Sequence, residues 1–120
     1  MSRALLIVDH GSRLEEANQM LETVGRMLRD KRPDLIVQIA HMELAEPTIE
    51  QGVEACIKAG ATEIAVHPYM LSPGRHAIQD IPQMAAEAVA HFPHIRLTVT
   101  DPLGLHEKIG DVILERAGLQ

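Results

Sequence analysis

Residues 64–82 read Ile-Ala-Val-His-Pro-Tyr-Met-Leu-Ser-Pro-Gly-Arg-His-Ala-Ile-Gln-Asp-Ile-Pro, and they contain the clearest strand-to-helix transition of the chain. It begins with an apolar run that is typical of a buried strand, and it leads into an apolar-periodic segment, 81–92, that indicates a helix. A plain connection between a strand and a helix needs only about 2–6 residues. The connection from His67 to Pro82 is longer and carries histidine, arginine and aspartate, so we expect it to have a function. Asp80 and Pro82 are expected to begin the helix.

The alternation of a short apolar run with an apolar-periodic segment occurs throughout the chain. Strands are predicted at 4–8, 35–40, 63–66 and 95–99, each followed by a helix. Right-handed crossovers place such helices on both faces of a parallel sheet. We therefore predict an α/β protein, a three-layer α/β/α sandwich with a four-stranded parallel sheet. By analogy with flavodoxin-like folds, the strand order is expected to be 2-1-3-4.

Local signals mark where the predicted helices begin and end. Ser12 and Glu15 have the spacing of a capping box, which places a helix start there. Pro47 sits where a first-turn proline belongs in the second helix. Gly60 is the expected end of that helix, and Gly118 is the expected end of the last one.

The amino-acid composition limits the classes of protein to which this chain could belong. The chain has 120 residues, of which 46% are hydrophobic and 23% charged, so we expect one folded domain, 1–120. Its net charge of −6 argues against nucleic acid or an anionic membrane as the main partner. No apolar run approaches the roughly 20 residues that span a bilayer, and we expect no signal peptide. Cys56 is the one cysteine and is expected to be a core residue, which suits a soluble, cytoplasmic protein.

Polar side chains collect where the predicted strands end, and this is the edge at which parallel sheets bind ligands. They are His10, His41, Glu43, Tyr69, Arg75, His76, Asp101 and His106. Because the first and third strands are expected to be neighbours, His10 and His76 would face each other where the strand order reverses. His91 and His94 fall at the opposite edge and are expected to be solvated.

For several of these histidines a structural role is an alternative to a role in binding or catalysis. His10 could hydrogen-bond the first turn, and His76 could be an exposed loop residue. His67 precedes a proline within the strand, so we expect it to be buried and hydrogen-bonded. His106 lies in the first turn of the last helix, where a surface position is expected.

The residue types at this edge suit a metal site. Two imidazoles and a carboxylate with an open position fit Co²⁺, Ni²⁺ or Fe²⁺. His41 alternates with Glu43, so the two side chains could point the same way. The absence of a cysteine cluster argues against a closed zinc site, and no dinucleotide or Walker A motif occurs. Ser12 lacks the Gly-x-Ser-x-Gly setting of a nucleophile and is expected to cap the helix.

Four segments together resemble the sirohydrochlorin chelatases, small class II enzymes that insert cobalt, iron or, in some archaeal members, nickel into sirohydrochlorin-type tetrapyrroles. They are Val-Asp-His-Gly-Ser-Arg (8–13), Met-Glu-Leu-Ala-Glu-Pro (42–47), Pro-Tyr-Met-Leu-Ser-Pro-Gly-Arg-His (68–76) with Asp-Ile-Pro (80–82), and Asp-Pro-Leu-Gly (101–104). The resemblance spans nearly the whole chain, and the segment after the third strand is its most specific part. It implies a chelatase-like fold and a lyase of cobalamin or sirohaem biosynthesis.

The resemblance also implies a set of site residues. A two-histidine metal site corresponds to His10 and His76, and Glu43 is the third candidate, as a ligand or a base. The divalent metal, Co²⁺, Fe²⁺ or Ni²⁺, would be a substrate, with no permanently bound cofactor. Histidine suits this chemistry because its reference pKa, about 6.5, lets it hold a metal or accept a proton near neutral pH.

The tetrapyrrole would need contacts of its own. Its carboxylates make Arg13 and Arg75 the expected partners, through charge-assisted hydrogen bonds, although both could be ordinary solvated arginines. Met70 and Leu71 could offer an apolar platform to the ring face, or they could belong to the core. Longer members of the family have two domains that face each other, so this chain resembles the short form, which would need a homodimer for an equivalent cleft.

Two other functions fit the same fold. A non-catalytic metal or tetrapyrrole carrier would bind its ligand stoichiometrically, without repeated turnover. A purely structural homodimer, in which the motif loops form the interface, would bind neither metal nor tetrapyrrole.

Overall fold

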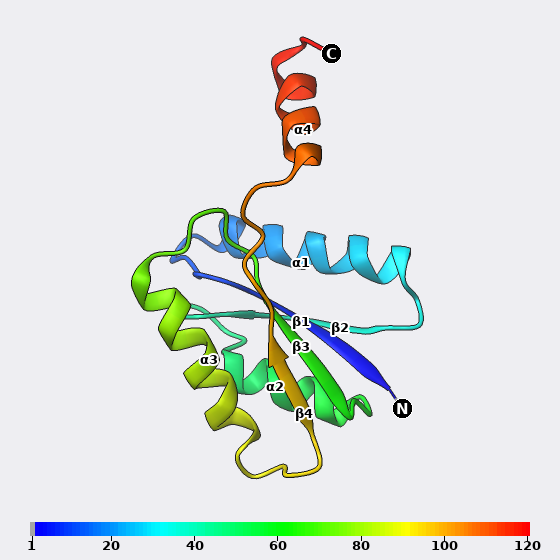
Figure 1. The fold of residues 1–120 in the computed structure, drawn as a ribbon, viewed down its shortest axis with the longest axis vertical. Coiled ribbons are helices and arrows are strands. Elements are labelled where there is room, and N and C mark those ends of the chain that lie inside the picture. The colour runs from blue at the N-terminus through cyan, green and yellow to red at the C-terminus, as the bar shows by residue number, and fades with distance from the viewer. Residues whose placement is uncertain (1) are drawn as a thin grey trace.

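The computed structural model describes residues 2–120, in which strands and helices alternate along the chain. The elements are β1 (Arg3–Asp9), α1 (Glu15–Lys31), β2 (Ile36–His41), α2 (Ile49–Lys58), β3 (Glu63–Pro68), α3 (Arg75–Val89), β4 (Arg96–Val99) and α4 (Glu107–Ala117). All strand pairs are parallel, and the order across the sheet is β2-β1-β3-β4 (Figure 1). The predicted fold class and strand order are confirmed.

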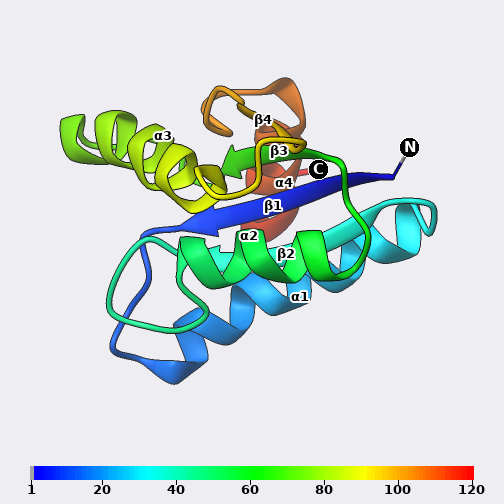
Figure 2. The same cartoon turned by 90° about the horizontal axis from the view of Figure 1, so that it is seen from below.

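The sheet separates two apolar clusters. The larger cluster lies under α2 and α3, and the smaller one lies between the sheet and α1. Figure 2 shows α1 and α3 on opposite sides of β1. Leu6 and Ile7, which follow each other on β1, point to opposite clusters, and each is at most 1% exposed. Cys56 is fully buried in the larger cluster, which confirms its expected core position.

The start of α3 differs from the prediction. The helix begins at Arg75, after the N-cap Gly74, so Asp80 and Pro82 lie inside it instead of beginning it. The buried stripe explains the difference, because Ala77 is only 2% exposed and continues the apolar face upstream of Pro82. Packing of that face outweighs the cost of an interior proline. As a result, Arg75 and His76 occupy the first turn of a helix and not a loop.

The start of α1 also differs from the prediction. Its N-cap is Leu14 and makes no side-chain capping bond, so Ser12 and Glu15 do not form the expected capping box. The hydroxyl of Ser12 instead accepts a hydrogen bond from the backbone N–H of Leu14, at 3.0 Å. The helix therefore begins later than the pattern predicted, because Ser12 forms a turn that precedes it.

The capping box of this chain lies at α2. Thr48 is the N-cap, and its side chain and that of Gln51 bond reciprocally to backbone N–H groups. Pro47 consequently precedes the cap and is not in the first turn, contrary to the prediction. The two glycine signals are confirmed, since Gly60 follows the end of α2 with φ +104° and Gly118 ends α4 with φ +72°.

The last helix, α4, stands apart from the other layers. Figure 1 shows it extending beyond the end of the sheet, opposite the N-terminus. None of its residues is buried. Across residues 2–120, no helix combines the length and the apolar character that crossing a bilayer requires.

Candidate functional site

The loop after β1 is held against the segment after β2 by backbone contacts. Met42 donates its N–H to the carbonyl of Asp9 at 2.9 Å, and Glu43 donates to the carbonyl of His10 at 3.1 Å. Gly11 has φ +88°, and a Cβ atom there would lie 1.8 Å from the carbonyl oxygen of Glu43. Only glycine fits this close approach. The backbones of His10 and Glu43 are therefore fixed side by side.

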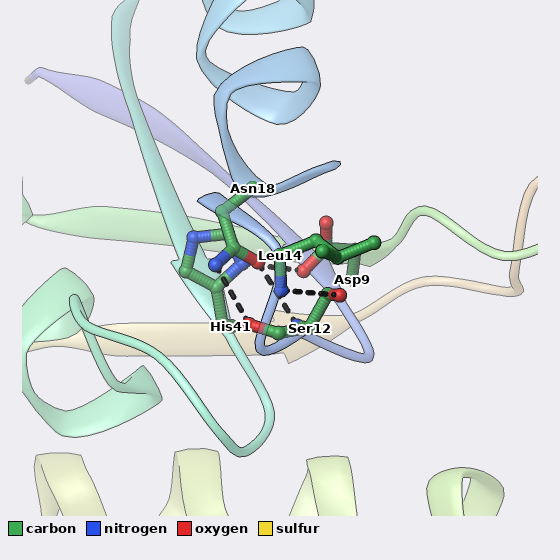
Figure 3. Close-up of polar contacts among 5 residues, drawn as sticks. All are labelled: Asp9, Ser12, Leu14, Asn18 and His41. Atoms are coloured by element: carbon green, nitrogen blue, oxygen red, sulfur yellow. Dashed lines mark hydrogen bonds and ion pairs between the residues drawn. The ribbon is translucent and has the colours of Figure 1, made fainter. Parts of the chain in front are cut away.

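A buried histidine holds the residue before His10. The Nδ1 atom of His41 lies 2.6 Å from Oδ1 of Asp9, and the His41 ring is 2% exposed (Figure 3). The Asp9 side chain is more open, at 22% exposed, and it lines the hollow described below. Residue pairing in the sheet places His41 directly beside Asp9, at the last position of both strands. The pair therefore fixes the end of β1 from which His10 emerges.

A second buried polar residue, Asn18, holds the same loop from the side of α1. Its Oδ1 accepts from the N–H of Ser12 at 2.9 Å, and its Nδ2 donates to the carbonyl of Ser12 at 2.8 Å (Figure 3). The side chain is in the interior, with Asn18 7% exposed. The sequence analysis missed this residue. The signal available was a polar side chain next to Ala17 and Leu21, within the apolar stripe of the helix.

A hollow of about 350 Å³ opens beside this loop, between the first turns of α1 and the segment that follows β3. Its lining residues are Asp9, His10, Gly11, Ser12, Ala17, Asn18, Met20, Leu21, Tyr69, Met70, Leu71 and Ser72. The N–H of Tyr69 donates to the carbonyl of Val8 at 2.6 Å, which holds the two lining segments together. The structure thus brings His10 to the same hollow as Met70 and Leu71.

The two apolar candidates differ in exposure. Met70 is 6% exposed and belongs to the larger core cluster, so its side chain has a structural role as well as a place in the lining. Leu71 is 62% exposed and is free to contact a ligand. Of the two side chains, only that of Leu71 is largely open to solvent.

The other predicted site residues lie outside the lining of this hollow. Arg75 and His76 are exposed in the first turn of α3, and Arg13 and Glu43 are exposed beyond the ends of β1 and β2. Within residues 2–120 there is no cluster of three or more His, Cys, Asp and Glu side chains that could hold a metal ion. The structure therefore does not place His76 and Glu43 with His10 in a closed ligand set.

His67 and His106 each form a hydrogen bond within the chain. Nδ1 of His67 lies 2.9 Å from Oγ1 of Thr100, and desolvation of the half-buried ring lowers the pKa of His67 below its usual value. His106 is the N-cap of α4, and its Nδ1 accepts from the backbone N–H of Lys108 at 3.1 Å. His67 was expected to be hydrogen-bonded, and it is, although it is half-buried and not fully enclosed.

Comparisons with known proteins place this chain in a family. The CbiX family matches residues 4–118. The chain is 45% identical over 112 residues to the chloroplastic sirohydrochlorin ferrochelatase of Arabidopsis thaliana, covering 93% of this chain and 50% of that one. It is 30% identical over 139 residues to the sirohydrochlorin cobaltochelatase of Methanococcus maripaludis, covering 95% of this chain and 96% of that one.

Solved structures agree with the sequence comparisons. The sirohydrochlorin chelatase SirB from Bacillus subtilis subspecies spizizenii, in complex with cobalt, has a TM-score of 0.88 at 38% identity, and the match covers 98% of this chain and 50% of that one. SirB from Bacillus subtilis with Fe³⁺ has a TM-score of 0.87 at 36% identity, and the match covers 97% of this chain and 46% of that one.

The lengths divide these relatives into two groups. The chain spans about half the length of the Arabidopsis ferrochelatase and of the SirB structures, but nearly the whole length of the Methanococcus protein. The family match covers all the segments that carry the predicted site residues. The chain belongs to the CbiX family of sirohydrochlorin chelatases.

Proposed function

We propose that this protein is a chelatase that inserts a divalent metal, Co²⁺ or Fe²⁺ and in principle Ni²⁺, into sirohydrochlorin or a related tetrapyrrole. The observation that carries the proposal is the match along 95% of this chain and 96% of a sirohydrochlorin cobaltochelatase. A relative of nearly the same extent bears that activity in its name. The reaction would make this protein a lyase of cobalamin or sirohaem biosynthesis.

Metal insertion requires that an ion lose its water ligands and that two pyrrole N–H protons leave. We assign His10 and His76 to binding the incoming ion and to accepting protons from the ring. The backbone of Glu43 is hydrogen-bonded to that of His10, and its carboxylate would help to bind the ion or to accept the protons. The metal ion is a substrate that must be released to the ring, so ligands that leave its coordination incomplete suit the transfer better than a closed site would. Imidazole and carboxylate ligands are compatible with all three metals.

The tetrapyrrole would lie over the hollow beside His10. Leu71, with its exposed side chain, would contact the apolar ring face, and Met70 would support it from the core. Arg13 and Arg75, both exposed, would pair with the carboxylates at the ring edge. The chain carries a net charge of −6, so these local positive charges would have to outweigh the overall repulsion of an anionic substrate.

A complete cleft would require a second copy of the chain. The SirB structures are about twice as long as this chain, so they contain additional sequence of comparable length. We propose that 1–120 forms one domain and that two such domains face each other as a homodimer. We also propose a cytoplasmic location, supported by a free and fully buried Cys56 that suits a reducing compartment.

The test is a turnover experiment with sirohydrochlorin and each metal in large excess over protein, followed by the change in the absorption spectrum of the tetrapyrrole. Many insertions per chain are expected, with one of the three metals fastest. A plateau at one insertion per chain would indicate a carrier and would overturn the proposed activity. A protein that binds neither metal nor tetrapyrrole would point to a structural dimer.

A further inference from the structure

We propose that Tyr69 binds the tetrapyrrole, with its phenol ring stacked on the face of the macrocycle. The inference rests on the proposed function and adds a substrate-binding residue to the site around His10. Three features of the structure lead to it, namely the scarcity of aromatic residues in the chain, the exposure of Tyr69 on a fixed backbone, and its place in the lining of the hollow beside His10.

Aromatic residues are scarce in this protein. The chain has one tyrosine, one phenylalanine and no tryptophan, and none of these is among the buried residues within 2–120. Phe92 is partly buried and packs against the larger core cluster, whereas Tyr69 is 39% exposed and lies outside both clusters. Packing of the core therefore does not account for an aromatic residue at position 69.

The alternation of side chains along the segment turns Tyr69 away from the core. In β3, Ile64 and Val66 belong to the larger cluster, and Met70 joins the same cluster just beyond the strand. Met70 is 6% exposed, whereas Tyr69 and Leu71 on either side of it are 39% and 62% exposed. Tyr69 and Leu71 therefore lie on the outer side of this segment.

The backbone around Tyr69 is held on both sides. The N–H of Tyr69 donates to the carbonyl of Val8 at 2.6 Å, which ties it to β1 just before His10. The carbonyl groups of the residues before and after Tyr69 each accept a hydrogen bond, at 3.2 Å, from the backbone of 103–104. A tyrosine on a fixed backbone has only two side-chain torsions to order, so binding through it costs little conformational entropy.

The lining of the hollow relates Tyr69 to the path of the metal ion. His10 and Tyr69 both line the hollow of about 350 Å³, a volume within the range of about 300–1,000 Å³ that is usual for small-molecule sites. An ion held at His10 must approach the four ring nitrogens from one face of the macrocycle, so that face must be turned towards His10. Tyr69 would then meet the same face, while the carboxylates lie at the ring edge.

A phenol ring suits the face of a tetrapyrrole. The macrocycle is flat and conjugated, and aromatic pairs in offset-stacked geometry are more stable than burial of their apolar area alone would make them. The hydroxyl of tyrosine can stay hydrated at the mouth of a hollow while the ring is covered. Leu71, which we assign to the same face, offers apolar area but cannot stack. Tyr69 would therefore add a preference for a flat aromatic ligand.

The single tyrosine makes the contact directly measurable in the unsubstituted protein. Labelling with ring-¹³C tyrosine gives the NMR signals of one ring to follow, and metal-free sirohydrochlorin is the probe. The ring current of a conjugated macrocycle shifts protons over its face upfield and protons at its edge downfield. We expect the Tyr69 ring signals to move upfield as sirohydrochlorin is added. Unchanged or downfield signals in protein that binds sirohydrochlorin would overturn the proposal.

Substitutions separate the aromatic ring from its hydroxyl. Tyr69→Phe keeps the ring and should retain the wild-type KM for sirohydrochlorin. Tyr69→Leu cannot stack and should raise that KM about three- to tenfold. Its kcat and its KM for the metal should not change, because the contact is made equally before and during insertion. A wild-type KM in Tyr69→Leu, or the same rise in Tyr69→Phe, would contradict stacking.

Leu103→Ala is the matched control. Leu103 is also 39% exposed and lines a second hollow, of about 490 Å³, between α4 and the segment after β3. It does not line the hollow beside His10, so Leu103→Ala should leave the KM for sirohydrochlorin unchanged. An equal rise in Leu103→Ala and Tyr69→Leu would show that both substitutions act through the fold and would count against the contact.

The NMR titration needs no metal, so its outcome is distinct from that of the turnover assay. Protein that turns over without an upfield shift would keep the chelatase activity and lose the proposed contact. Protein that shows the upfield shift but inserts metal only once per chain would keep the contact and lose the activity. A chain that binds no sirohydrochlorin would overturn both proposals.

Discussion

Nδ1 of His41 and Oδ1 of Asp9 are 2.6 Å apart at the ends of two neighbouring strands, immediately before His10. His41 is only 2% exposed and does not line the hollow, whereas Asp9 does, so we expect any contribution of His41 to the site to act through Asp9. We expect His41→Gln to lower the affinity for Co²⁺ by about tenfold, as the loss of an outer partner at a metal site commonly does.

The measurement is titration with Co²⁺ followed by its visible absorption spectrum, whose shape reports the ligand geometry. Asp9→Asn, which keeps a hydrogen-bond acceptor, should retain more affinity than Asp9→Ala. His91→Gln, at an exposed position beyond α3, serves as the control. A His41→Gln protein with wild-type affinity and spectrum would show that the pair only stabilises the fold.

Gly11 should be intolerant of any side chain. Its positive φ alone costs about 1–3 kcal/mol for another residue, and a Cβ atom would collide with the carbonyl of Glu43. Gly60→Ala provides the matched control, because Gly60 also has positive φ but has open space around its Cβ position. Denaturant unfolding should show a larger loss of stability for Gly11→Ala, and equal losses would indicate that the loop moves aside.

Stability should fall in acid partly because of His67. Burial lowers the pKa of this ring in the folded state, so the unfolded chain binds more protons as the pH drops through about 6.5. The free energy of unfolding contributed by the neutral ring is therefore present above that pH and is lost below it. His67→Asn should lose less stability than the wild type between pH 7.5 and pH 5.5 in thermal melts. Parallel losses in the two proteins would rule out this contribution.

Cys56 should be unreactive in the native protein. Burial raises the pKa of its thiol to about 12, so almost no thiolate exists at pH 8. A thiol reagent such as Ellman's reagent should label it only after unfolding, at one equivalent per chain. Rapid labelling under native conditions would mean that α2 opens from the sheet.

The repeating pattern of short apolar runs and periodic segments was enough to predict a parallel sheet, because each run is long enough for one strand and each connection is long enough for a crossover. The strand order came from analogy with flavodoxin-like folds. Helix starts were less predictable. Ser12 has the spacing of a cap but forms the turn before α1, and Pro82 resembles a helix start but lies within α3. A local hydrogen bond from the N–H of Leu14 to the hydroxyl of Ser12 decided the first case, and burial of Ala77 in the core decided the second.

The local sequence pattern also predicted only part of the candidate site. The position of His10 after β1 and its nearness to Glu43 follow from strand order, so both could be anticipated. The pairing of Asp9 with His41 spans 32 residues and needs the parallel register of β1 and β2, which the local pattern does not specify. The spacing of Ile109, Val112 and Ile113 predicts that one side of α4 packs on a surface, but a local pattern cannot say which surface that is.

The most direct test of the central claim is the rate of metal insertion into sirohydrochlorin by His10→Ala and His76→Ala, with His94→Ala as the control at an exposed position beyond α3. If the two imidazoles bind the ion and accept the ring protons, each variant should lose about 100-fold or more of the rate while its thermal melt stays close to the wild type. His94→Ala should insert metal normally. Wild-type turnover by both His10→Ala and His76→Ala would contradict the account.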